Sequence, residues 1–174
     1  MKKTLLLVGS ALLVGACAQA PAPGTSSPET TSAVRPADSA RTDAIDAYRG
    51  MWDAFSVAGT TADAASPLLG QHAAGAALEK LKRSLQSDRE KGLVSKGTPV
   101  LDPKVSAADP AGDPRKITIT DCGDSTNWLK YRKDNGMLAD DVPGGRRLIK
   151  AAVEKQPDGT WKVSDYGVHE VGSC

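Results

Sequence analysis

This sequence has few aromatic residues, few histidines and almost no net charge, and each of these shortages excludes a class of core, site or partner. One phenylalanine, three tryptophans and three tyrosines amount to 4% of the chain, so a core must rest mainly on Leu, Val, Ile and Ala. The 22 basic and 21 acidic residues nearly balance, which implies no nucleic-acid partner. The sequence contains no glycine-rich phosphate cradle, nucleophile elbow or Walker motif.

Metal-ligating patterns are also missing. The two histidines, His72 and His169, lie far apart, and neither has a second ligand at the usual spacing. Asp140 and Asp141 lie in a glycine-rich loop that lacks the alternating oxygen ligands of an EF-hand. We therefore expect no metal site and no cofactor.

The N-terminal apolar run is too short to span a bilayer, which needs about 20 apolar residues, and it follows two lysines as in an export signal. Val14–Cys17 resembles the bacterial lipobox, in which the cysteine is lipidated and becomes the mature N-terminus. We expect residues 1–16 to be a lipoprotein signal peptide and Cys17 to hold the protein on the extracytoplasmic face of the cell membrane. The alternative is an ordinary signal peptide cleaved after Ala18 or Ala20.

The chain has three cysteines, and the odd number supports the anchor. If Cys17 is lipidated, Cys122 and Cys174 remain as a pair in an oxidising compartment, where a disulfide is expected. The competing possibility is two free thiols, but Asp121 and Asp124 flank Cys122 and would raise its thiol pKa.

The segment after the lipobox, residues 17–40, is rich in Pro, Ser, Thr and Ala and has no aromatic residue. Such a composition cannot bury enough apolar surface to fold. We expect a disordered tether there, followed by a single domain over residues 41–174.

Two stretches have the 3.6-residue period of amphipathic helices. In the first, Ile45, Tyr48, Trp52 and Phe55 form an apolar stripe, and Gly59 ends it.

The second helical stretch begins at Leu68 and Leu69 and carries a stripe of Ala77, Leu78, Leu81 and Leu85, with charged residues solvated on its other side. Gly92 ends it.

From Leu93 the period changes to two, which predicts strands. The strand-like stretches are residues 93–110 in short pieces, 115–122, 127–133, 146–155 and 159–172. The turn sequence QPDG makes the last two an antiparallel hairpin. Helices followed by an antiparallel meander indicate an α+β fold.

This order of elements resembles secreted actinobacterial lipoproteins with a nuclear-transport-factor-like (SnoaL-like) domain. The marks that carry the resemblance are Trp52, the Asp121–Asp124 turn, Trp128, Gly159, Trp161, Val163 and the terminal Cys174. The resemblance implies a cone fold, with N-terminal helices packed in the concave face of a curved antiparallel sheet. It implies no particular reaction.

The sequence leaves two hypotheses about function, a binding module and an enzyme. The first is a monomeric binding module that takes a small apolar ligand in the cone or docks a cell-envelope protein. The second is a cone-fold isomerase, cyclase or dehydratase, in which Asp165, His169 and Tyr48 are the candidates for acid–base groups. Strand periodicity places Asp165 and His169 on the face of Trp161, unless Gly167 introduces a bulge. The simpler interpretation gives both residues a structural or solvent-exposed role.

Overall fold

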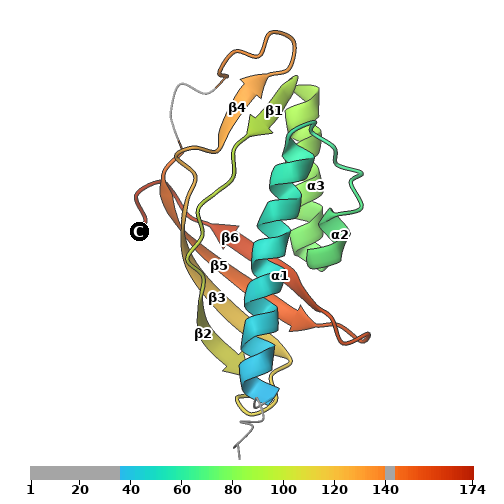
Figure 1. The fold of residues 1–174 in the computed structure, drawn as a ribbon, viewed down its shortest axis with the longest axis vertical. Helices are drawn as coiled ribbons and strands as arrows, with labels where there is room; N and C mark the ends of the chain where they lie inside the picture. Colours follow the sequence, from blue (N-terminus) through green and yellow to red (C-terminus); the bar gives the residue numbers. More distant parts are fainter. Residues whose placement is uncertain (1–35, 140–143) are drawn as a thin grey trace, which may run out of the picture. The chain divides into compact units, whose positions relative to one another are not determined.

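The structure is a computed structural model that describes residues 36–139 and 144–174. These residues form three helices and six strands (Figure 1). In chain order they are α1 (Pro36–Gly59), α2 (Leu69–His72), α3 (Gly75–Glu90), β1 (Leu93–Lys96), β2 (Lys104–Asp109), β3 (Lys116–Asp124), β4 (Leu129–Arg132), β5 (Arg146–Lys155) and β6 (Trp161–Val168).

Helix α1 is longer than the sequence predicted. It begins at Pro36, so residues 36–40 are helical, whereas the sequence predicts that they belong to the tether. Proline suits the first helical position because its missing N–H has no intrahelical acceptor there. Ala40 and Ala44 are buried at the start of the core-facing stripe. The prediction from composition was wrong here because each alanine buries little apolar area, so the segment appeared unable to fold. Small alanine side chains nevertheless allow a helix to pack closely against a sheet.

The main sheet is antiparallel and open, with strand order β2-β3-β5-β6. Figure 1 shows α1 lying across one face of this curved sheet, with α3 beside it. The β5–β6 hairpin pairs Ala151 with Tyr166 and Ile149 with Val168, as the turn sequence predicted. Gly159 in the turn has a φ of +88°, which favours glycine. The α+β prediction is confirmed.

The fourth strand does not join this sheet. β4 pairs instead with β1, forming a separate two-stranded ladder in which Val94 lies opposite Tyr131. β3 and β5 therefore become direct neighbours, with Asp121 opposite Ile149 and Gly123 opposite Arg147.

The core-facing rows of β3 and β5 explain where the packing is incomplete. Alternate residues of β3 from Ile117 to Gly123 are all buried. The facing row of β5 contains Ile149, Ala151 and Val153, and by the same alternation it begins with Arg147. The two rows thus end, side by side, in a glycine and a half-buried arginine. Since a glycine fills no volume and an arginine carries charge, the core gives way to a pocket there.

None of the helices within the described ranges is long and apolar enough to cross a membrane. The predicted signal peptide, Cys17 and most of the predicted tether lie outside the described residues, as do Asp140 and Asp141.

Candidate functional site

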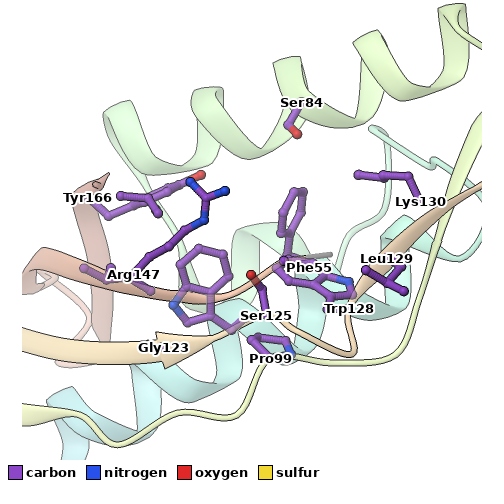
Figure 2. Close-up of a pocket in the computed structure, with 14 residues that line it drawn as sticks. Phe55, Ser84, Pro99, Gly123, Ser125, Trp128, Leu129, Lys130, Arg147 and Tyr166 are labelled. Carbon is purple, nitrogen blue, oxygen red and sulfur yellow. The ribbon is translucent and has the colours of Figure 1, made fainter. Parts of the chain in front are cut away.

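A pocket of about 430 Å³ lies at the end of the core-facing rows, beneath helix α3. Figure 2 shows Ser84 of α3 on one side of it, and Pro99, Gly123 and Ser125 on the opposite side. Small-molecule sites in proteins occupy about 300–1,000 Å³, so the volume suits a small organic ligand. The pocket is lined by Trp52, Phe55, Ser84, Pro99, Gly123, Ser125, Trp128, Leu129, Lys130, Gly144, Arg147, Ile149, Tyr166 and Val168.

Four aromatic side chains dominate the pocket wall. Trp52 and Phe55 come from α1, Trp128 from the segment before β4, and Tyr166 from β6. The Trp52 ring lies 5.4 Å from Tyr166 and 6.0 Å from Trp128, both edge to face, and Phe55 lies 5.5 Å from Trp128. Such geometry is favourable for aromatic pairs. A chain with few aromatic residues has concentrated them around one cavity.

Gly123 helps to keep the pocket open. A Cβ atom at this position would lie 2.8 Å from Cδ1 of Ile149, which is closer than side chains normally approach. Any larger residue would therefore displace Ile149 and occupy the space beside it.

Two charged side chains, Lys130 and Arg147, line the pocket. Arg147 has no carboxylate partner among the described residues. Its Nη1 donates a hydrogen bond of 3.3 Å to the backbone carbonyl of His169. A guanidinium has five N–H donors, so most of its capacity is unused by these contacts.

Lys130, the other cation of the pocket wall, is already bound to side chains of the protein. Its Nζ forms an ion pair with Asp88 of α3 and donates to Ser95 Oγ at 2.9 Å. Asp88 and Ser95 are both buried. This network connects α3 with β1 and β4, so Lys130 has a structural partner already.

Two indole N–H groups in the wall have no hydrogen-bond partner among the described residues. They belong to Trp52 and Trp128. Trp52 is buried, with 5% of its surface exposed. The Trp52 N–H lies close enough to the Tyr48 hydroxyl to lower that group's pKa slightly, although the contact does not reach hydrogen-bond geometry. Buried donors are usually satisfied, so both positions are unusual.

Tyr48, one of the three acid–base candidates, is fully buried beneath the sheet and is absent from the pocket wall. Its hydroxyl donates to Asp121 Oδ2 at 2.9 Å, and the backbone N–H of Asp102 donates to Asp121 Oδ1 at 2.8 Å. Burial, followed by the negative charge of Asp121, raises the Tyr48 pKa well above its usual value. The hydroxyl therefore stays protonated near neutral pH and connects α1 to the sheet.

Asp165 does not lie on the face of Trp161 and Val163, contrary to the prediction. The β5–β6 register shifts between Ala152 and Val153, which pair with Asp165 and Val163 respectively. The extra residue, Ser164, forms a β-bulge, so each residue after it lies on the opposite face of the sheet from the one that simple alternation predicts. Tyr166 consequently faces the core, whereas Asp165 is exposed. The bulge occurs before Asp165 and not at Gly167.

The Asp165 carboxylate is occupied by an ion pair. Lys80 Nζ of α3 lies 2.6 Å from Asp165 Oδ1 and 2.6 Å from the backbone carbonyl of Tyr166. The hydrogen bond from Lys80 holds the Asp165 pKa below its usual range. Lys80 thereby also satisfies a carbonyl on the edge strand β6, whose edge is further covered where Ala74 N–H donates to Val163.

His169 follows the end of β6 and is exposed. Its ring is not part of the pocket wall, although its backbone carbonyl accepts from Arg147. His72 packs instead against Gly50, where a Cβ atom would lie 2.6 Å from its Nδ1. No group of three or more potential metal ligands occurs in the part of the chain that the structure describes.

The predicted disulfide is present. Cys122 and Cys174 are bonded across a separation of 52 residues, with Cα atoms 5.8 Å apart. Arg146 Nη2 lies 3.1 Å from Cys122 Sγ on the outer face of the sheet. The bond ties the C-terminus to the end of β3.

Sequence reasoning missed Arg147 and the aromatic pocket. The alternation that places Ile149, Ala151 and Val153 on one face also places Arg147 there, so extending that row by one residue would have identified it. The meeting of Trp52 and Trp128 had no comparable signal, because they are far apart in the chain.

Comparisons with known proteins add little to this geometry. No family model matches the sequence, and no curated protein matches it. Among solved structures, the chain is similar to the intermembrane space region of the chloroplast protein ARC6, with 13% identity and a TM-score of 0.48. The similarity covers 74% of this chain and 95% of that one.

Proposed function

We propose that this protein is a lipid-anchored, extracytoplasmic module that binds a small, largely apolar ligand in the pocket between α1, α3 and the sheet. The observation that carries the proposal is the pocket itself: about 430 Å³ walled by four aromatic side chains. Pockets for small molecules are mostly apolar, with a few polar groups to orient the ligand.

The cellular location rests on the sequence. A cationic start, a short apolar run and Cys17 at the end of that run support lipidation. The Cys122–Cys174 disulfide supports an oxidising compartment, in which such bonds persist. The cone fold belongs to the same proposal, and α1 packed on one face of the curved sheet supports it.

Binding is favoured over acid–base catalysis because of what surrounds the cavity. The described lining residues include no Asp, Glu or His. Asp165 is paired with Lys80 outside the pocket, and His169 is exposed. General acid–base chemistry requires a titratable group within hydrogen-bond reach of the substrate. Of the two such groups in the described wall, Lys130 is paired with Asp88, and Tyr166 has a pKa raised to about 12, which disfavours proton transfer near neutral pH.

The proposal is tested with phenyl-naphthylamine, a neutral apolar probe that becomes fluorescent in apolar sites. We expect saturable binding at one site per chain. Ser84→Phe should weaken it by about tenfold or more, because Ser84 lines the pocket from an exposed position on α3 and a ring there fills the cavity.

The matched control is Gln86→Phe, which adds the same ring to another exposed position of α3 that does not line the pocket. This variant should bind like the wild-type protein. Absence of saturable binding, or equal affinity in the Ser84→Phe variant, would exclude the pocket as the binding site.

A further inference from the structure

We infer that the ligand of this pocket is an amphipathic organic anion, with an apolar body against the aromatic wall and one acidic group held by Arg147. The inference rests on the proposed binding function and adds the chemical class of the ligand. It follows from the position, the contacts and the electrostatic surroundings of Arg147.

The position of Arg147 is set by β5. It belongs to the core-facing row that continues with Ile149 and Ala151, while its neighbour Arg146 lies exposed on the opposite face beside Cys122. Figure 2 shows the Arg147 side chain within the pocket region that Tyr166 and Ser125 also line. A guanidinium on the apolar side of a sheet is costly unless an anion or several acceptors satisfy it.

The protein supplies no anion to Arg147 from its described residues. No ion pair joins it to a carboxylate there, and a hydrogen bond to a backbone carbonyl is the protein contact of its guanidinium. Asp121 lies on the same face of the sheet, but its two oxygens already accept from Tyr48 and from the Asp102 backbone. Arg147 therefore keeps a planar set of donors suited to a bidentate contact with a carboxylate, sulfonate or phosphate.

The surrounding charges favour an anion as well. The described wall contains two cations, Lys130 and Arg147, and no acidic residue. Asp88 neutralises Lys130, which leaves the positive charge of Arg147 without a compensating carboxylate among the described residues. In a partly enclosed apolar site, such a charge acts more strongly than at an exposed surface.

The body of the ligand is defined by the remaining wall. Trp52, Phe55, Trp128 and Tyr166 present mainly aromatic surface, together with the unpaired indole N–H groups of Trp52 and Trp128. The Ser125 hydroxyl is already bonded to the backbone of Gly145. A ligand with a compact apolar body and a single acidic group would pack against the aromatic wall and bind Arg147.

The test uses two probes with the same apolar body. Anilinonaphthalene sulfonate differs from phenyl-naphthylamine by one sulfonate group, so their affinities isolate the contribution of the charge. We expect the wild-type protein to prefer the sulfonate by about tenfold, and Arg147→Met to lose this preference while it retains binding of the neutral probe. Arg146→Met, which removes the neighbouring charge on the other face, should keep the preference.

A second measurement needs no variant. Decanoate and decanol have the same chain length and differ in the charged head, and both can compete with the neutral probe for the wild-type protein. We expect decanoate to compete at lower concentration.

The outcomes separate the two proposals. Equal affinity for the two probes, a preference that survives Arg147→Met, or equal competition by decanoate and decanol would overturn the inference while leaving the binding function standing. If neither probe binds, the proposed function fails and the inference fails with it.

Discussion

The hydrogen bond between Tyr48 and Asp121 offers a direct test of the packing between α1 and the sheet. Asp121 is 2% exposed, and its carboxylate accepts one bond from the Tyr48 hydroxyl and one from the Asp102 backbone. Tyr48→Phe removes the first donor and leaves almost all of the ring packing in place. It therefore isolates one hydrogen bond to a buried charged group.

The expected cost follows from the character of that bond. A hydrogen bond to a charged group contributes about 1.5–3 kcal/mol, and the loss approaches the upper value when the charge stays buried. We expect Tyr48→Phe to lower the free energy of unfolding by about 2–3 kcal/mol. In a domain of this size that corresponds to a fall in Tm of roughly 6–10 °C.

Thermal and urea denaturation followed by circular dichroism measure this cost. Tyr166→Phe is the matched control, because the Tyr166 hydroxyl makes no hydrogen bond within the described residues, and we expect it to change stability by about 0.5 kcal/mol or less. In an Asp121→Asn background the cost of Tyr48→Phe should shrink, since the accepting charge is gone. Equal stability of Tyr48→Phe and Tyr166→Phe would refute the argument that the buried carboxylate depends on this donor.

Three other predictions concern separate parts of the chain. Cys122→Ser should lower the free energy of unfolding by about 4 kcal/mol, the loop-entropy value for a 52-residue separation; an unchanged melting temperature, or two titratable thiols in the native protein, would contradict it. Cys17→Ala should release the protein from membranes or block its processing, and mass spectrometry of the wild-type protein should find an acylated Cys17; an unmodified N-terminus at a later residue would remove the anchor. Burial raises the Tyr166 pKa to about 12. The unfolded chain loses this proton near pH 10, so the contribution of the neutral hydroxyl to the free energy of unfolding is fully present below about pH 10 and is lost as the pH rises toward 12. Wild-type protein and Tyr166→Phe should therefore have similar stability below pH 10 and diverge above it, because only the wild-type protein loses this contribution; stabilities that stay parallel up to pH 12 would count against the shift.

Local periodicity accounts for the parts of the fold that were predicted correctly. The stripe of Tyr48, Trp52 and Phe55 predicted the second half of α1, and the alternation around Ile117 and Ile149 predicted the two central strands. These patterns are readable because each depends on residues close together in the chain. The same local logic failed at residues 36–40, where alanine-rich composition gave no sign of the sheet against which α1 packs.

The sequence by itself determined the helices, the strands, the β5–β6 hairpin and the pairing of two cysteines, because periodicity, turn residues and a cysteine count are properties of the chain alone. Tertiary structure decided that β4 leaves the sheet for β1, that the bulge at Ser164 turns Asp165 outward, and that Arg147 lines the same pocket as Trp52 and Trp128 with no carboxylate partner among the described residues. The first and third of these outcomes depend on contacts between segments far apart in the chain, and the second depends on how β6 pairs with β5 and packs against α3. Such contacts are settled by the packing of whole elements against one another, and no local pattern encodes them.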